Sequence, residues 1–418
     1  MPSFRFLHAA DLHLDSPLRG LERDADAPVE RIRRATRDAL VNLVDLALEE
    51  RVAFVLLAGD LYDGDWRDWG TGQFLVAQLA RLAAAGIRVV AISGNHDAAS
   101  VLTRQLRWPE GAVLLPADRP ATVELASCAV AVHGQSFATR DVGDNLALAY
   151  PPAIPGRLNI GLLHTAAGRG GHENYAPCTP EQLAGHDYHY WALGHIHARE
   201  VISERPWIVF PGNLQGRDIN EAGAKGASLV TVHDGTIATV EHRVLDVVRW
   251  QRLIVDLSGA VDEDGVLSLA RAAMAGAVTG ADGRMLAFRL VLSGDCAVHA
   301  ALVGDPGGLR EKLRAEAIAV AGGAPIWLED VRLATRAPRR TDRARDDAVG
   351  TLLRAIDETA PESLAVAMRD YAAAMLGRAP ALRARLGADH PAVRLAAGEM
   401  PAEFLDRARA LLLARLGE

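Results

Sequence analysis

The stretch YHYWALGHIHA, residues 188–198, is an apolar run that ends in two histidines. His195 and His197 are separated by one residue, and residues two apart in an extended backbone point to the same side. The two imidazoles can therefore meet at one spot, and imidazole is the commonest metal ligand in proteins. The alternative is a pair of solvated loop histidines. Whether similar residues follow the other strands decides between these interpretations.

Five expected strands end in side chains that bind metals through oxygen or nitrogen. The strands are 4–10, 52–58, 87–93, 159–163 and 189–193, and the residues that follow them are Asp11, His13, Asp60, Asn95, His164, His195 and His197. In three cases a glycine stands directly before the first of these residues. A single DxH or GD motif is most often turn chemistry, but α/β sheets bind ligands at the carboxyl ends of their strands. Together the five strand ends predict one metal site, which His195 and His197 complete.

The first half of the chain alternates these strands with amphipathic helices. One helix is expected from Pro28 through Glu50, where apolar residues recur at helical spacing, and a second over 70–85, ended by Gly86. Further strands are expected at 129–133, 207–210 and 228–232. This order predicts an α/β sandwich whose sheets have both parallel and antiparallel parts.

The composition indicates a soluble protein of two or three domains. It has 418 residues, of which 50% are hydrophobic and 23% charged, an ordinary balance. The N-terminus does not resemble a signal peptide, no apolar run is long enough to span a bilayer, and the three cysteines lack CxxC spacing. We therefore expect a cytoplasmic protein without a membrane partner. The net charge of −8 leaves no global basic field for nucleic acid, so local arginines would have to hold it.

The seven ligand candidates exceed what one ion needs. They suit two ions about 3.5–4 Å apart that share a carboxylate and a hydroxide. Because the set contains no sulfur, Mn²⁺, Fe²⁺ or Zn²⁺ fits better than a thiolate metal. Such a pair lowers the pKa of bridging water and neutralises an oxyanion, as phosphoester hydrolysis requires. The sequence has no GxSxG motif and no plausible Cys–His pairing, so covalent catalysis is a poor competitor.

The series DxH, GD, GNHD, H and GHxH resembles the calcineurin-like metallophosphoesterase superfamily. The resemblance implies a two-sheet sandwich flanked by helices, with a metal-bridging hydroxide as the nucleophile. It also implies that His96 is the general acid that protonates the leaving oxygen, and that Asp97 orients its ring. One ion would be held by Asp11, His13 and His197 and the other by Asn95, His164 and His195, with Asp60 bridging.

Longer stretches resemble the bacterial DNA-repair exonuclease group, which includes the nuclease subunit SbcD and, nearer to this sequence, YhaO-type proteins. They are AADLHLDSPLRGL (9–21), AGDLYDGD (58–65), GNHD (94–97), HTAAGRGGHENYAPC (164–178), LGHIH (193–197) and PGNLQGRDINEAGAKGA (211–227). The resemblance is dense over 4–245 and implies a DNA exonuclease, with endonuclease action on single strands, that uses Mn²⁺. Relatives often carry a histidine where this chain has Asp63. A carboxylate there repels phosphate unless it is hydrogen-bonded away.

Five residues near these motifs are candidates for substrate contact: His133, Arg169, His172, Tyr175 and Arg217. Arginine suits phosphate, and tyrosine suits stacking on a base. The alternative for the segment 166–177 is a glycine-rich surface loop. We expect His8 to be packed inside its strand.

Beyond residue 245 the pattern changes to a small α/β cap and a helical C-terminus. Strands are expected at 249–257, 284–294 and 325–335 and helices at 265–274 and 308–320, a βαββαβ-like or shorter unit. The segment 337–347 is a charged linker by composition. The helices that follow it present apolar residues at Leu352, Leu353, Ile356, Met368, Tyr371, Ala372, Met375, Leu376, Phe404, Ala408, Leu411 and Leu412. The expected domains are 1–245, 246–336 and 337–418.

The resemblance implies that the cap positions DNA and that the C-terminal helices dock onto an SMC-like ATPase of the SbcC/YhaN type. Two copies of each chain would form the complex, so a homodimer is expected. One alternative is a helical end that packs on itself. The others are a phosphodiesterase for cyclic nucleotides or nucleotide-linked lipids, a protein phosphatase, and a subunit whose role is chiefly assembly.

Overall fold

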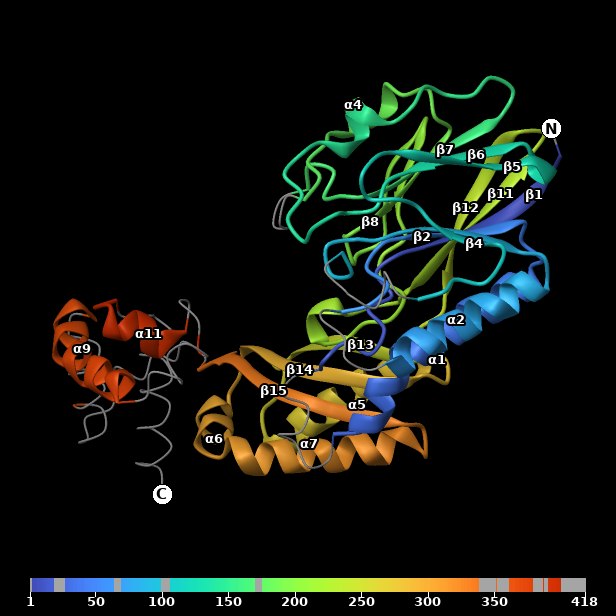
Figure 1. The fold of residues 1–418 in the computed structure, drawn as a ribbon. Coiled ribbons are helices and arrows are strands. Elements are labelled where there is room, and N and C mark those ends of the chain that lie inside the picture. The colour runs from blue at the N-terminus through green and yellow to red at the C-terminus, as the bar shows by residue number, and fades with distance from the viewer. Residues whose placement is uncertain are drawn as a thin grey trace. The chain divides into compact units, whose positions relative to one another are not determined.

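The computed structural model (Figure 1) describes residues 2–18, 27–63, 69–98, 106–169, 175–337, 351, 361–378, 386 and 390–399. The chain divides into two compact units. The first unit comprises residues 1–251 and 281–287, and the second comprises residues 252–280 and 288–418.

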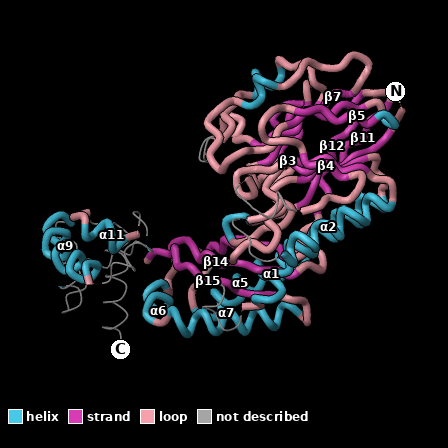
Figure 2. Tube along the Cα trace, viewed as in Figure 1, coloured by secondary structure: helices cyan, strands magenta, loops and turns pink. Residues whose placement is uncertain are grey.

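Two six-stranded sheets make up most of the first unit, and Figure 2 shows their strands in magenta. The first sheet has the order β12 (Thr236–Val244), β11 (Gly226–His233), β1 (Phe4–Ala9), β2 (Phe54–Ala58), β3 (Arg88–Ile92), β4 (Ala112–Leu114). The second has the order β5 (Ala121–Leu125), β6 (Val130–Gly134), β7 (Leu158–His164), β8 (Tyr190–Gly194), β10 (Trp207–Phe210), β9 (Glu200–Glu204). Strands β1 to β4 are parallel, as are β6, β7, β8 and β10, whereas the other pairs are antiparallel. The expected sandwich with mixed sheets is confirmed.

Both faces of the first sheet are covered by clusters of apolar side chains. Helices α1 (Val29–Glu49) and α2 (Trp69–Ala84) bury their apolar sides in one cluster with Leu7 and Val55 of the sheet. On the other face, Phe6 belongs to a cluster that includes Leu162 and Tyr190 of the second sheet. Burial on both faces explains why these strands are continuous apolar runs in the sequence. Both helices begin and end within one residue of the expected positions.

A three-stranded sheet follows, in the order β13 (Val248–Asp256), β14 (Met285–Asp295), β15 (Ile326–Arg336). Its helices are α5 (Glu263–Gly280), α6 (His299–Gly304) and α7 (Pro306–Ala321). The expected helix at 265–274 is too short, because Ala277 continues the buried stripe of Ala270 and Met274 and the helix runs on to Gly280. The short α6 was not expected from the sequence.

The C-terminal helices α9 (Pro361–Gly377) and α11 (Pro391–Ala396) pack against each other. Ala372, Leu376 and Leu395 are buried, whereas Tyr371 is 72% exposed and Met375 is 48% exposed. The expected apolar positions at 352, 353, 356, 404, 408, 411 and 412 lie outside the described residues, as does the linker from residue 338. The three-domain division stays a prediction. Within the described ranges, no helix is long and apolar enough to cross a membrane.

Candidate metal centre

The loops after β1 and β2 run side by side at the carboxyl ends of these parallel strands. The backbone N–H of Asp11 donates to the carbonyl of Gly59 at 3.1 Å, and that of His13 donates to the carbonyl of Asp60 at 3.0 Å. These bonds continue the sheet beyond the strands and bring the DxH motif to the GD motif. The backbone N–H of His195, after β8, donates to both carboxylate oxygens of Asp11 at 3.0 Å. The strand ends therefore converge, as the sequence predicts.

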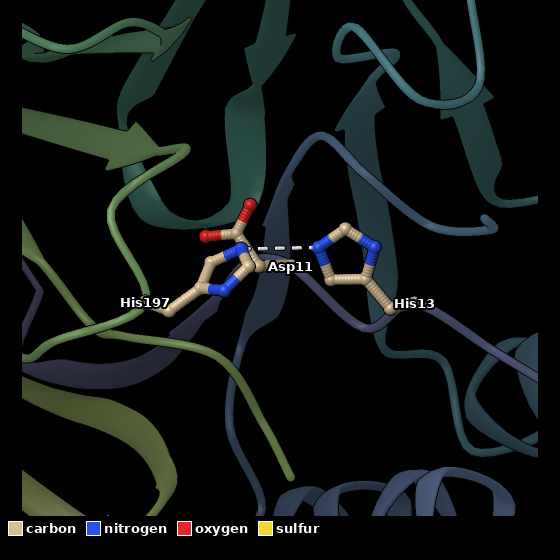
Figure 3. A group of neighbouring side chains, drawn as sticks. All are labelled: Asp11, His13 and His197. Atoms are coloured by element: carbon tan, nitrogen blue, oxygen red, sulfur yellow. Dashed lines mark hydrogen bonds between the residues drawn. The ribbon is translucent and has the colours of Figure 1, made fainter. Parts of the chain in front are cut away.

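Three overlapping groups of acidic and histidine side chains could each hold a metal ion. They are Asp11, His13, His197; Asp11, Asp60, His164; and His13, Asp60, His96, and within each group the ligand atoms lie within 4.8 Å of one another. Two groups share Asp11 and two share Asp60. Figure 3 shows the first group, with one ring nitrogen of His13 and one of His197 pointing toward each other beside the Asp11 carboxylate.

The two imidazoles of the first group fit two ligands of one ion. The Nε2 atoms of His13 and His197 lie 3.1 Å apart, and His197 Nδ1 lies 2.8 Å from a carboxylate oxygen of Glu221. Since a carboxylate accepts, we assign the proton of His197 to Nδ1, which leaves the Nε2 lone pair available. Imidazole nitrogens bind a metal ion such as Zn²⁺ at about 2.0–2.1 Å. Two nitrogens that bind the same ion are therefore about 3 Å apart, which agrees with the 3.1 Å between the two Nε2 atoms. A carboxylate behind a ligating histidine is the usual support of such a site.

His164 is the centre of the second group. Its Nδ1 lies 2.9 Å from the carbonyl oxygen of Ala58, and its Nε2 lies 3.0 Å from Asn95 Oδ1 and 3.4 Å from Asp60 Oδ2. Burial by itself would lower the pKa of His164, but the carboxylates of Asp60 and Asp11 raise it to about 9. The position of the His164 ring therefore favours positive charge, as a site for a cation requires.

The ring of His195 lies beside His164, with 5.3 Å between ring centroids. The ring centroid of Tyr175 is 5.5 Å from that of His195. His195 is in none of the three groups, so its role as a ligand stays a prediction.

Four of the predicted ligands have a left-handed backbone. The φ angles are +52° for Asp11, +42° for His13, +51° for Asp60 and +100° for His195. Such conformations of residues other than glycine cost about 1–3 kcal/mol each and persist only where the surrounding structure holds them. Here the sheet-like bonds between the loops hold Asp11, His13 and Asp60, and hydrogen bonds to the Asp11 carboxylate hold His195. Strain of this kind is common at functional sites.

Close packing explains two of the glycines that precede ligands. A Cβ atom on Gly94 would lie 2.3 Å from Asp60 Oδ1, and one on Gly194 would lie 1.9 Å from the carbonyl oxygen of Ala58. Any side chain at these positions would push the ligand loops apart. The glycines are therefore required by the approach of one loop to another.

The ring of His96 lies at the edge of the site and is 39% exposed. Its Nδ1 lies 2.5 Å from Asp63 Oδ1, and this hydrogen bond raises the pKa of His96. Asp63 also accepts hydrogen bonds from the hydroxyl of Ser16 and from Nη1 of Arg217. Burial alone would raise the pKa of Asp63, but the hydrogen bonds of His96 and Ser16 and the charge of His13 lower it. Asp63, which stands where relatives often carry a histidine, is thus hydrogen-bonded to its neighbours.

Asp97 is buried beneath the same loops. Its carboxyl group accepts the backbone N–H of Leu61 at 2.8 Å and that of Gly94 at 2.5 Å. Burial and the charge of Asp60 raise the pKa of Asp97 to about 8. These bonds tie the loop after β2 to the loop after β3. That Asp97 also orients the His96 ring stays a prediction.

Three of the substrate candidates already have protein partners. His133 is buried, with Nδ1 2.8 Å from the Thr122 hydroxyl and Nε2 3.0 Å from Asn159 Oδ1, so neither ring nitrogen is left for a substrate. Arg169 pairs with Glu200, and Arg217 with Glu221 and Asp63. Tyr175 lies beside His195, and His172 lies outside the described residues.

His8 is packed as expected, with Nδ1 3.0 Å from the Tyr190 hydroxyl.

Glu221, Lys225 and Ser16 support the site but were not predicted from the sequence, because none of them belongs to the DxH, GD, GNHD or GHxH motifs. Glu221 contacts the ring of His197, and the buried Lys225 donates from Nζ to the carbonyl of His197 at 2.7 Å. Both belong to the stretch 211–227, which was singled out only by resemblance. Ser16 belongs to the stretch 9–21, whereas Asp63, in the stretch 58–65, was singled out in the sequence as a departure from relatives.

Comparison with known protein families agrees with this geometry. Residues 4–199 match the calcineurin-like phosphoesterase family. The chain carries a calcineurin-like metallophosphoesterase domain. Residues 250–336 match the middle domain of the metallophosphoesterase YhaO. The metallophosphoesterase domain accounts for the ligand series at the strand ends.

Individual relatives include an uncharacterized metallophosphoesterase, a nuclease subunit and a DNA double-strand break repair protein. The chain is 38% identical over 261 residues to an uncharacterized metallophosphoesterase, YhaO, of Bacillus subtilis, covering 61% of this chain and 64% of that protein. It is 35% identical over 100 residues to the SbcD component of the nuclease SbcCD of Rhodobacter capsulatus, covering 23% and 22%. It is 26% identical over 285 residues to the DNA double-strand break repair protein Mre11 of Methanopyrus kandleri, covering 61% and 60%. The chain thus spans less than two thirds of each of these relatives.

Proposed function

We propose that this protein is a two-metal phosphodiesterase that degrades DNA in repair, as an exonuclease and, on single strands, as an endonuclease. The observation that carries the proposal is the set of three overlapping Asp/His groups at the strand ends. The names of two relatives, one a nuclease subunit and the other a DNA double-strand break repair protein, support DNA as the substrate. The division into residues 1–245, 246–336 and 337–418 is part of the proposal, with the middle segment positioning DNA.

The donor set suits two Mn²⁺ ions, and Fe²⁺ or Zn²⁺ has the same ligand preference. One ion would be held by Asp11, His13 and His197 and the other by Asn95, His164 and His195, with Asp60 between them. When bound, such ions lower the pKa of water and neutralise charge on the phosphate.

His96 would protonate the leaving oxygen. With Nδ1 held by Asp63 at 2.5 Å, Nε2 is the ring atom that can pass a proton to a substrate. The partial exposure of the ring lets a substrate reach it. The backbone N–H of His96 donates to Asp60 Oδ1 at 2.9 Å, which ties the acid to the metal ligands.

A substrate panel tests the DNA assignment. Purified protein with Mn²⁺ should degrade labelled duplex and single-stranded DNA faster than cyclic nucleotides, a nucleotide-linked lipid or a phosphopeptide. The Asp60→Ala variant, purified in the same way, controls for contaminating nucleases. Hydrolysis confined to the small molecules or the phosphopeptide would contradict the DNA assignment while leaving the phosphoesterase chemistry intact.

We also propose that the C-terminal helices dock onto an SMC-like ATPase of the SbcC/YhaN type, in a complex with two copies of each chain. Tyr371 and Met375 of α9, four residues apart, are exposed apolar side chains on one side of the helix. The net charge of −8 also favours a partner that helps to hold DNA, since duplex binding requires several neutralised phosphates.

Co-purification with the ATPase tests this docking. Deletion of residues 346–418, or the paired change Tyr371→Glu and Met375→Glu, should reduce recovery of the ATPase, because charge in an apolar interface is unfavourable. Ala373→Glu, at an exposed position on another side of α9, is the matched control. Equal recovery of all chains would contradict the docking. Light scattering of the isolated chain tests the homodimer.

A further inference from the structure

We infer that Arg217 is a positioning residue that holds two carboxylates in place, one behind a predicted metal ligand and one behind the predicted general acid. The inference rests on the proposed function for the part that concerns catalysis. It replaces the sequence-based expectation that Arg217 contacts the substrate.

The first carboxylate is that of Glu221. Nε of Arg217 donates to Glu221 Oε1 at 3.1 Å and Nη2 donates to the same oxygen at 2.6 Å, while the backbone N–H of Arg217 donates to Oε2 at 2.9 Å. Asn213 also donates to Oε2, at 2.8 Å. Glu221 is thereby fixed in the orientation in which Oε1 lies 2.8 Å from Nδ1 of His197. Nη2 of Arg217 also lies 3.3 Å from Nδ1 of His197, but both nitrogens carry protons, so Arg217 acts on the His197 ring through Glu221.

The second carboxylate is that of Asp63. Nη1 of Arg217 donates to Asp63 Oδ2 at 3.3 Å, and the other oxygen, Oδ1, lies 2.5 Å from Nδ1 of His96. Arg217 and Asp63 are 154 residues apart in the chain. One guanidinium group thus joins the support of His197 to the support of His96.

Burial and charge explain why a guanidinium is needed here. The side chains of Arg217, Asp63 and Glu221 are only 18%, 15% and 11% exposed. Two poorly solvated carboxylates repel each other unless a cation lies between them. The planar guanidinium can donate to both at once, which the ammonium of a lysine cannot do in the same geometry.

The substrate alternative is weaker because all three guanidinium nitrogens already donate to protein carboxylates. An arginine that binds phosphate needs N–H groups directed at the ligand. Loss of a substrate contact and loss of a positioning residue also change different kinetic constants, and this difference provides the test.

The experiment compares Arg217→Gln, Glu221→Gln and Asp63→Asn in the full chain. Isothermal titration of metal-free protein with Mn²⁺ measures affinity without any reaction. Turnover of a model phosphodiester at saturating Mn²⁺ gives kcat and KM. We expect Glu221→Gln to weaken Mn²⁺ binding by about 10–100-fold with kcat retained, and Asp63→Asn to lower kcat with Mn²⁺ affinity retained. Arg217→Gln should show both losses with KM nearly unchanged.

A double variant and two controls sharpen this comparison. Adding Arg217→Gln to Glu221→Gln should weaken Mn²⁺ binding little further, because the two residues act through one contact. Arg217→Lys keeps the charge and should lie between wild type and Arg217→Gln, and it also serves if Arg217→Gln does not fold. Arg243→Gln removes an arginine that pairs with Glu50 at 2.9 Å, and it should change neither the Mn²⁺ affinity nor kcat.

Three results would overturn the inference. A raised KM with unchanged Mn²⁺ affinity and kcat would make Arg217 a substrate contact. Unchanged constants throughout would leave it no role in the site. A fully additive double variant would show that Arg217 acts independently of Glu221. If wild-type protein cleaves no phosphodiester at all, the proposed function fails, but the Mn²⁺ titration still decides whether Arg217 supports His197.

Discussion

Replacement of Asp60 by alanine is expected to reduce Mn²⁺-dependent phosphodiester hydrolysis to background. The Asp60 carboxylate belongs to two of the three ligand groups. Its Oδ2 lies 3.4 Å from Nε2 of His164 and 3.8 Å from Nε2 of His13, so its loss removes a carboxylate that lies between these two histidines. The variant should also bind Mn²⁺ more weakly in isothermal titration, since a shared ligand is lost.

Asp45→Ala is the matched control for this prediction. Asp45 pairs with Arg81 on the surface, and its side chain is 44% exposed. Its replacement should leave hydrolysis and Mn²⁺ affinity unchanged, because exposed ion pairs contribute little. Hydrolysis by Asp60→Ala at the wild-type rate would show that the metal site lies elsewhere.

Replacement of His96 by alanine is expected to lower kcat by about 10²–10⁴-fold, the range found for a lost general acid. The loss should depend on the leaving group. It should be large for a DNA phosphodiester, whose alkoxide must be protonated, and much smaller for a p-nitrophenyl ester, whose leaving group is stable without a proton. Mn²⁺ affinity should stay at the wild-type value.

Titration and a control distinguish the two roles that the geometry allows for His96. Because His96 also belongs to a group with His13 and Asp60, a fall in Mn²⁺ affinity would make it a ligand instead of the acid. An equal loss for both leaving groups would likewise contradict proton donation. His233→Ala replaces an exposed histidine at the end of β11 and should have no effect.

Most of the sandwich and the convergence of its strand ends were predictable from local patterns. Apolar runs, helical spacing and glycine stops depend on residues near one another in the chain. The later part was less predictable, because α5 runs to Gly280, beyond the expected end at Met274, and α6 has only six residues. A helix that short carries too few positions to show a periodic pattern.

The sequence by itself determined which residue types stand at the strand ends, because each ligand lies at the end of its strand or within four residues after it, and parallel strands bring their carboxyl ends to one edge. Only the tertiary structure decided what supports those ligands. Asp63 meets His96 and Arg217, and Glu221 meets His197, through contacts between loops that follow different strands. Hydrogen bonds of this kind depend on how the sheets pack and where the loops cross, and no local spacing encodes them. The same is true of His133, a polar residue near a strand end that the packing buries between Thr122 and Asn159.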